Sequence, residues 1–469
     1  MSGPELPAVA WSAPPPLVSM AGVLGALALA LGAFRWAQVR GWVSDEGARK
    51  GVHVSMGAIT LALPWLFDAD WPVLVLCGLA VAAMLALRLA RPLREHVGGV
   101  LHGVARESVG DLVFPVAVCG LYLLAADTPV FYAIPLLLLG LADPAAALVG
   151  LRHGQGLFET VDGRKSREGS VAFLAVAFLC VHVPLLLATE LGRLECLLVA
   201  VIVALLMSMV EAVAWRGLDN LFVPLGTYLV LVQTTTLSGP RLGLHLAVIV
   251  ALIGVAAVLR RRTTLGGAGV LAAALVAYVT WAFGGLPWLI APLLVYALYT
   301  RLWRGPAADG DVDRPHTVLN VLSVTSVGTA WLFAARALDQ PWLIVPYTAA
   351  YAGYLAAVGV ERLALQRDGW TGTRMWGRRA LVAAAPAAVV QTAGLVAALG
   401  MQRLGAPLWT AALGLALTGA VALAVAVALA RWGRAVDGTT TEFATRVRRA
   451  ALVGALSTLG LAALPWLAP

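Results

Sequence analysis

The residues with the clearest chemical potential lie between 139 and 170, where an apolar run ends at Asp143 and leads to the loop GRKSREGS. An acid at such a depth in an apolar segment is costly unless it faces a polar cavity, a partner or an ion. A helix that begins after the loop would also direct its free backbone N–H groups towards it, and such groups bind anions. This stretch therefore indicates a metal and phosphate site. Its candidate nucleotide-binding residues are Arg164, Lys165, Ser166, Glu168, Gly169 and Ser170.

A second polar stretch, RKGVHVSMGA, contains Arg49, Lys50 and His53. Arg49 and His53 are four residues apart and share a face if the stretch is helical. Basic residues that merely anchor a helix end at a membrane surface would explain Arg49 and His53 as well. The lysine favours chemistry, because only two of the 33 basic Lys and Arg residues are lysines, Lys50 and Lys165. A compact, flexible ammonium can follow a moving phosphate, whereas a planar guanidinium is less adaptable.

The third candidate group is in MSMVEAVAWRGLDNLFVPLGT, where Glu211 lies near the end of an apolar helix and Asp219 and Asn220 follow. Asp219 and Asn220 also suit the start of a helix, which is the ordinary explanation for them. Glu211 has no comparable explanation. Because oxygen ligands combined with phosphate favour Mg²⁺, we expect Asp143, Glu211 and Asp219 to bind metal.

Composition places these groups in a membrane. The chain of 469 residues is 60% hydrophobic and only 12% charged, which excludes a soluble globule. The net charge of +8 is spread over short loops, so we assign it to membrane orientation and expect no nucleic-acid partner. We predict an all-α polytopic transmembrane protein of about sixteen helices. The expected spans are near 17–34, 52–67, 71–88, 109–126, 130–149, 170–189, 197–214, 219–237, 242–259, 268–283, 287–300, 316–335, 341–360, 380–400, 406–430 and 450–466.

The distribution of basic residues predicts the orientation. If the N-terminus is outside, the cytoplasmic loops contain 29 of the 33 Lys and Arg residues, as the positive-inside rule requires. Every candidate site loop of the first half is then cytoplasmic. We also expect two domains, a catalytic one at 1–239 and a second helical one at 240–469. The acids of the second part lie in loops or at segment ends, which argues against another active site there.

The order RKGVH, RESVGD, ADPAAALVG, GRKSREGS and then Glu211 with GLDNLFVP resembles the CTP-dependent lipid-alcohol kinases, the family of phytol kinase, dolichol kinase and the CTP-type diacylglycerol kinase. These kinases are related to the phosphatidate cytidylyltransferases. The resemblance covers about residues 45–235. It implies a membrane enzyme that transfers the γ-phosphate of CTP or another nucleoside triphosphate to a membrane-embedded alcohol. RRRTTLGGAGV in the second part is only faintly similar to the membrane family proposed to phosphorylate phytyl phosphate.

This resemblance and the residue chemistry lead to specific roles. Phosphoryl transfer requires placement and neutralisation of charge, so we expect Mg²⁺ on Asp143 and Glu211 and the triphosphate on Lys50 and Lys165. Arg49, His53 and Asn220 are further expected nucleotide-binding residues. Asp219 would assist the metal or accept the alcohol proton. Two alternatives stay open: a cytidylyltransferase that releases pyrophosphate, and a transporter with buried acids but no nucleotide turnover.

Overall fold

The structure is a computed structural model that describes residues 14–89, 108–160, 163–259, 265, 267–302, 318–365, 385–394 and 396. Nearly all of these residues are helical, which confirms the all-α expectation. The spans expected at 406–430 and 450–466 lie outside the described residues, as does part of the one expected at 380–400. Contacts divide the chain into two compact units, Met1–Val250 and Ala251–Pro469.

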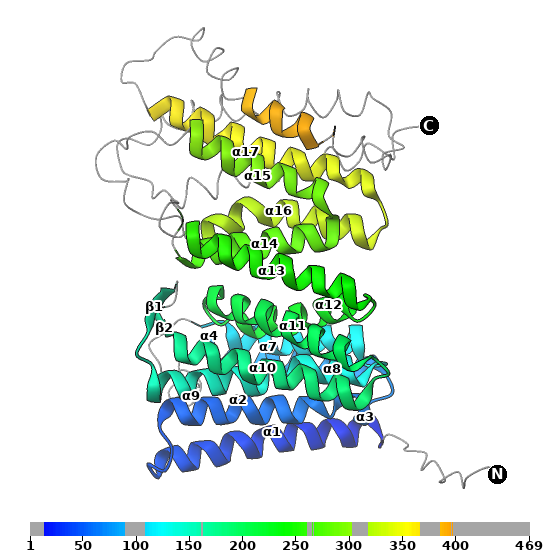
Figure 1. Ribbon diagram of the computed structural model, residues 1–469. Helices are drawn as coiled ribbons and strands as arrows, with labels where there is room; N and C mark the ends of the chain where they lie inside the picture. The colour runs from blue at the N-terminus through cyan, green and yellow to red at the C-terminus, as the bar shows by residue number, and fades with distance from the viewer. Residues whose placement is uncertain are drawn as a thin grey trace, which may run out of the picture. The chain divides into compact units, whose positions relative to one another are not determined.

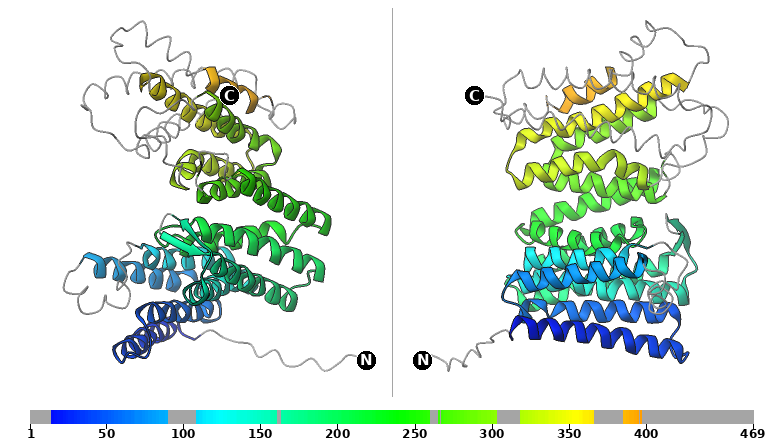
Figure 2. Two further views of the ribbon diagram at one scale, coloured as in Figure 1. Left: turned by 60° about the vertical axis from the view of Figure 1, so that its left-hand side comes forward. Right: turned by 180° about the vertical axis from the view of Figure 1, so that it is seen from behind.

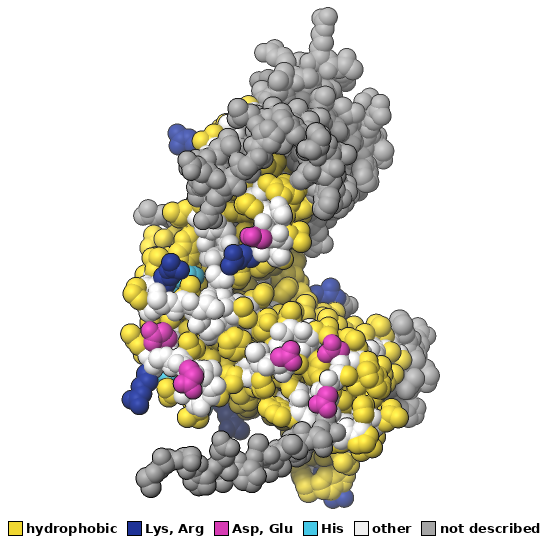
Figure 3. Space-filling view, turned by 90° about the vertical axis from the view of Figure 1, so that its right-hand side faces the viewer, with side chains coloured by type: hydrophobic (Ala, Val, Ile, Leu, Met, Phe, Trp, Pro, Cys, Tyr) yellow, Lys and Arg dark blue, Asp and Glu magenta, His cyan; other side chains and the backbone are white. Residues whose placement is uncertain are grey.

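Eight of the described helices are long and apolar enough to cross a bilayer. Three shorter apolar helices accompany them at Asp70–Ala86, Gly110–Ala125 and Leu286–Leu302. Figure 3 shows a face of the molecule on which hydrophobic side chains predominate and charged ones are few. A surface of this kind is stable against lipid rather than water, so the chain is an integral membrane protein. The eight long spans are Pro16–Val39, Pro129–His153, Arg167–Ala188, Arg193–Val213, Gly239–Val258, Gly267–Gly284, Val318–Ala337 and Pro341–Gly359.

The first unit begins with α1 (Pro16–Val39) and α2 (Asp45–Leu61), which lie side by side as an antiparallel pair (Figures 1 and 2). Ser44 caps α2 by accepting a hydrogen bond from the N–H of Gly47, and two acids follow in the first turn, where they complement the helix dipole. The helix therefore starts earlier than the apolar pattern predicts. The remaining helices of this unit up to the hairpin are α3 (Leu63–Leu66), α4 (Asp70–Leu89), α7 (Gly110–Ala125), α8 (Pro129–Leu137), the π-helix η1 (Leu138–Ala142) and α9 (Asp143–His153).

A two-stranded antiparallel hairpin, β1 (Leu157–Thr160) and β2 (Gly163–Ser166), interrupts the helices. The hairpin was not predicted, because a strand of four residues is too short to give a clear alternation of apolar and polar residues. It is followed by α10 (Arg167–Ala188), α11 (Arg193–Val213), α12 (Asp219–Thr234) and α13 (Gly239–Leu259). Figure 1 shows the hairpin and the α1–α2 loop at the same end of the helices of this unit.

The core of the first unit is centred on α11, which packs against both α10 and α12 and is buried along most of its length. Two buried tyrosines join other helices to α2 and the segment that follows it. Tyr132 donates to the carbonyl of Thr60 at 2.8 Å, and Tyr122 donates to that of Phe67 at 2.8 Å. The first bond fixes α8 against α2, which contains Lys50, and the second fixes α7 against the segment that follows α3.

The second unit is built from α14 (Gly267–Gly284), α15 (Leu286–Leu302), α16 (Val318–Ala337), the short 3₁₀ turn η2 (Pro341–Leu343) and α17 (Ile344–Leu365). Its buried core lies mainly between α15, α16 and α17. Aromatic rings occupy the centre: Trp288 and Tyr347 meet edge to face with centroids 4.7 Å apart, and Tyr351 lies 5.1 Å beyond.

Candidate active site

Asp143 is positioned by an irregular turn. The five residues of η1 form a π-helix directly before it, and Pro144 follows. Pro144 lacks an N–H, so it cannot complete the α-helical hydrogen bond to the carbonyl of Gly140. A π-helical turn accommodates such a break, and these turns are common at functional sites. The sequence therefore places a carboxylate at the point where a buried helix changes its winding.

A close helix crossing brings α2 to this turn. A Cβ atom on Gly57 would lie 3.6 Å from the Cα atom of Gly140, so the two backbones meet at a pair of residues without side chains. Lys50 is two helical turns before Gly57 and therefore on the same face of α2. The crossing delivers its side chain to Asp143, and Lys50 Nζ lies 2.5 Å from Asp143 Oδ2. Both side chains are largely buried, with 11% and 17% of their surface exposed.

The second lysine makes an equivalent pair with the second intramembrane acid. Lys165 lies on β2, where the antiparallel register sets it opposite Phe158. Its Nζ atom donates to Glu211 Oε1 at 2.7 Å and also to the backbone carbonyl of Glu211. Glu211 is buried near the C-terminal end of α11. The hairpin thus places the Lys165 ammonium beside the Glu211 carboxylate, which would otherwise lack a counter-ion in an apolar helix.

Asp219 joins these two pairs. It is the first residue of α12, and the turn 214–218 between α11 and α12 places it near Glu211. Asp143, Glu211 and Asp219 lie within electrostatic reach of one another, and Asp219 also interacts with Lys50 and Lys165. The helix cap at this position is Leu218, which makes no side-chain cap. The ordinary explanation of Asp219 as an N-cap is therefore wrong.

Arg49 and His53 lie on the same helix as Lys50 but differ in their contacts. Arg49 forms two hydrogen bonds to Glu46, at 2.6 and 3.0 Å, and 41% of its side chain is exposed. This bond raises the pKa of Arg49, so its charge is permanent. His53 packs edge to face on Phe114, with centroids 5.6 Å apart. Its buried Nε2 atom has no hydrogen-bond partner among the described residues, and it interacts electrostatically with Asp143.

Comparison with known proteins identifies the family. The chain is 33% identical over 188 residues to a protein named phytol kinase from Synechocystis sp., an alignment that covers 39% of this chain and 78% of that protein. The chain belongs to the lipid-alcohol kinase family. No protein-family model matches the kinase, and no solved structure matches it significantly. The family resemblance of the sequence is thereby confirmed, and the kinase is a phosphotransferase that acts on a lipid alcohol.

The loop before α10 is organised differently from the expected anion site. Ser166 caps α10 by accepting from the N–H of Gly169 at 3.1 Å, and the N–H of Arg167 donates to Gly156. The carboxylate of Glu168 accepts from the N–H groups of Gln155 and Gly156 at about 3.1 Å. The chain itself therefore satisfies N–H groups at this helix start. In the kinase, Glu168 joins the start of α10 to the segment just before β1 and thereby stabilises the position of the hairpin.

The other residues of the loop have separate positions. Gly169 packs closely on α9, because a Cβ atom there would lie 2.8 Å from the carbonyl of Ala146. Ser170 donates to the carbonyl of Ser166 at 3.2 Å, which is a bond within the helix. Arg164 is exposed on β2 next to Lys165. Of this group, Lys165 alone is brought to a carboxylate of the site by the bonds described here.

Asn220 supports the turn that carries Asp219. Its side-chain amide donates to the carbonyl of Gly110 at 3.1 Å, at the start of α7. The preceding Gly217 has φ +81, and a Cβ atom on it would lie 2.6 Å from the N atom of Gly110. Arg216 also has a positive φ of 54. The contact between Asn220 and Gly110 was not predicted from the sequence. A signal was present in the WRGLDN turn, because its glycine can adopt the left-handed backbone conformation that other residues avoid.

The residues present fit a magnesium ion that arrives with a nucleotide. Among the residues that the structure describes, no three His, Cys, Asp or Glu side chains form a ready metal-binding group. Mg²⁺ is commonly bound by one or two carboxylates together with substrate phosphates and water. Asp143 and Glu211 provide such carboxylates, and each is paired with a lysine in the structure.

Proposed function

We propose that the first unit transfers the γ-phosphate of CTP to the hydroxyl of an isoprenoid alcohol of the phytol type. The observation that carries this proposal is the pair of ion pairs, Lys50–Asp143 and Lys165–Glu211, formed by the two lysines of the chain with two intramembrane acids. A structural role alone would be served by the arginines that are abundant elsewhere. The choice of two ammonium groups supports phosphate binding by groups that change partners.

The charges of the site suit such an exchange. In the absence of nucleotide each lysine neutralises one carboxylate, so the buried groups carry little net charge. When a triphosphate enters, Lys50 and Lys165 turn their ammonium groups to its oxygens, which leaves Asp143 and Glu211 as the carboxylates that would hold Mg²⁺. The bound ion would neutralise the charge on the β- and γ-phosphates. The lysines stabilise the same charge as it moves to the bridging oxygen.

Asp219 is the remaining acidic side chain of the site that could interact with the alcohol, which accepts the phosphate. It is in electrostatic contact with Asp143 and both lysines, and we assign it to help hold the metal or accept the proton of the alcohol. His53, with its unpartnered Nε2 atom, lies beside Asp143 and is assigned to a phosphate oxygen. Arg49 is assigned to the outer end of the triphosphate, because part of its side chain is exposed.

The lipid and the nucleotide would approach from different directions. The helices that carry Asp143 and Glu211 are candidate membrane spans, so an alcohol can enter sideways from the bilayer. The hairpin and the α1–α2 loop lie at the same end of this unit (Figure 1) and contain basic residues. We propose that this end faces the cytoplasm, as the positive-inside rule predicts.

The test is transfer of label from γ-labelled CTP and ATP to phytol, farnesol, a polyprenol and diacylglycerol by purified protein. Labelled phytyl phosphate with CTP as the preferred donor, lost in Asp143→Asn and Lys165→Ala, supports the proposal. Glu190→Gln, a change at an exposed loop acid outside the site, is the control and should retain activity. Release of pyrophosphate without lipid phosphate would instead indicate a cytidylyltransferase. Failure of the folded protein to label any alcohol with either donor would refute the kinase.

A further inference from the structure

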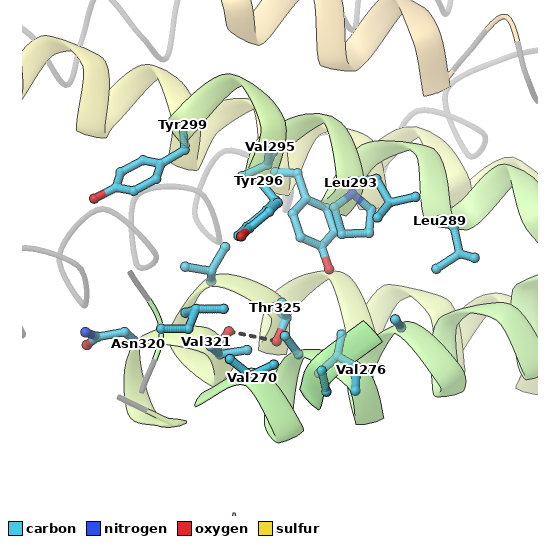
Figure 4. A pocket seen from close by; sticks show the side chains of 18 of the residues that line it. Val270, Val276, Leu289, Leu293, Val295, Tyr296, Tyr299, Asn320, Val321 and Thr325 are labelled. Atoms are coloured by element: carbon cyan, nitrogen blue, oxygen red, sulfur yellow. Dashed lines mark hydrogen bonds between the residues drawn. The ribbon is translucent and has the colours of Figure 1, made fainter. Parts of the chain in front are cut away.

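The second unit begins at Ala251, within α13. It contains a cavity of about 280 Å³ between this C-terminal part of α13 and helices α14, α15, α16 and α17. Figure 4 shows side chains of α15, including Leu289, Leu293 and Tyr296, facing Val270 and Thr325 of the helices below. The volume is nearly twice that of the ~150 Å³ engineered cavity that accepts benzene. It is therefore large enough for a length of branched hydrocarbon chain.

The lining selects against charge. Among the residues that the structure describes, no Asp, Glu, Lys, Arg or His lines the cavity, and its polar side chains are four tyrosines, Asn320 and Thr325. A phosphate or carboxylate placed there would lose its hydration without gaining a counter-ion. The hydroxyl of Thr325 already donates within its own helix, to the carbonyl of Val321 at 2.9 Å. The chemistry of the walls thus fits an uncharged, mostly hydrocarbon ligand.

One tyrosine of the lining has a buried hydroxyl that interacts with the hydroxyl of Tyr347 but makes no hydrogen bond of ordinary geometry to a described residue. This residue is Tyr351, which is 1% exposed. The neighbouring Tyr347 hydroxyl donates to the carbonyl of Trp288 at 2.6 Å. A Cβ atom on Gly328 would lie 3.0 Å from the Tyr351 hydroxyl, so this glycine makes room for it. A buried hydroxyl without a hydrogen bond of ordinary geometry is costly, and a ligand with one hydroxyl would satisfy it.

The cavity is also accessible from the apolar exterior. Leu293 is 58% exposed and Tyr296 is 38% exposed, although both line the cavity. The outer surface at α14 and α16 belongs to candidate membrane spans, so the opening meets lipid. A hydrocarbon chain can therefore enter without crossing water.

We propose that the second unit binds one long-chain lipid alcohol, with its chain in this cavity and its hydroxyl on Tyr351. This site is separate from phosphate transfer, because the described residues of its lining include no acid or base that could bind a nucleotide or metal. It discriminates between an alcohol and its phosphate ester, since the lining offers a hydrogen bond to the former and no counter-ion to the latter.

The test uses three photoreactive probes with the same branched chain and an aliphatic diazirine: the free alcohol, the hydrocarbon without a hydroxyl, and the phosphate monoester. Full-length protein in lipid nanodiscs is irradiated with each probe, and labelled peptides are mapped by mass spectrometry. We expect the alcohol to label peptides of α14, α15 and α16 more strongly than the other two probes do. Equal labelling by all three, or no alcohol label in these helices, would overturn the proposal.

Three variants locate the ligand. Ala277→Phe fills the cavity from α14 and should abolish the alcohol label. Ala297→Phe, which places the same bulk on an exposed position of α15 outside the lining, should keep it. Tyr351→Phe should reduce the preference for the alcohol over the hydrocarbon by roughly twofold to tenfold, the value of one hydrogen bond. Unchanged labelling in Ala277→Phe, or an unchanged preference in Tyr351→Phe, would contradict the assignment.

Kinase activity is measured on the same samples. Because the assigned catalytic groups are in the first unit, retained phosphate transfer in the variants shows that the protein is folded. A wild-type protein that binds the alcohol in the second unit but phosphorylates no lipid would refute the proposed function and leave this inference standing. Phosphate transfer by a wild-type protein that shows no alcohol label in the second unit would support the proposed function and refute this inference.

Discussion

The Lys50–Asp143 pair allows a stability effect to be separated from a catalytic one. We consider Lys50→Met, Asp143→Asn and the double variant. Each single change leaves one charge in a site where the side chains are 11% and 17% exposed. The double variant removes both charges at once. A pair that is only structural and a pair that binds phosphate and metal therefore predict different results for the double variant.

The magnitude follows from burial. Removing one partner of a buried ion pair costs about 3–5 kcal/mol, and the residual exposure of this pair places each single variant near the lower value, about 3 kcal/mol. For a domain of this size, that corresponds to a fall in the melting temperature of roughly 6–12 °C. Replacing both partners is close to neutral, so the double variant should be more stable than either single variant.

The assay combines thermal unfolding in detergent with transfer of γ-labelled phosphate from CTP to phytol. We expect the double variant to regain most of the melting temperature but none of the activity, because neither the metal carboxylate nor the phosphate ammonium is restored. Recovery of activity together with stability would refute the reasoning and reduce the pair to a structural element. A double variant no more stable than the single variants would show that the pair is not formed as described.

The remaining predictions concern the hairpin, the helix crossing and the metal. Lys165→Met should raise the KM for the nucleotide more than it changes that for the alcohol, whereas equal effects would argue against phosphate binding by Lys165. Glu168→Ala should increase proteolysis at 154–156 and lower kcat moderately, because the loop loses its hydrogen bonds to the Glu168 carboxylate; an unaltered cleavage pattern would contradict this role. Gly57→Ala should be tolerated, since its Cβ would lie 3.6 Å from Gly140 in ordinary contact, whereas Gly57→Leu should separate the helices and abolish activity; similar activity of both would be inconsistent with the crossing. Chelation with EDTA should stop transfer and added Mg²⁺ should restore it, and transfer that persists in EDTA would exclude a required metal.

The fold class and the helix positions followed from composition and periodicity. Lipid must face apolar side chains over a length set by the bilayer, so the spans expected near 170–189 and 197–214 could be located from hydrophobicity alone. In the structure they are α10 (Arg167–Ala188) and α11 (Arg193–Val213). The hairpin formed by β1 and β2 could not be located in this way, because its strands are only four residues long and are held by pairing with each other. The early start of α2 at Asp45 depends on a polar cap at Ser44, which an apolar pattern does not register.

The candidate site was predicted as a set of residue types and was assembled by packing. The acids of the apolar segments and the two lysines stood out, because burying a charge is expensive and the use of lysine is unusual in this chain. Which lysine meets which acid was not predictable, since 93 residues separate Lys50 from Asp143 and 46 separate Lys165 from Glu211. The sequence also could not reveal that Glu168 is occupied by backbone N–H groups.

The sequence by itself therefore determined the membrane setting, the inventory of charged groups and, through their order along the chain, the kinase family. Only the tertiary structure decided how these groups pair. The pairing of Lys50 with Asp143 depends on the approach of two backbones at Gly57 and Gly140, and that of Lys165 with Glu211 depends on a hairpin that returns to α11. Both are contacts between segments distant in the chain, whose geometry is set by side-chain packing rather than by local propensity.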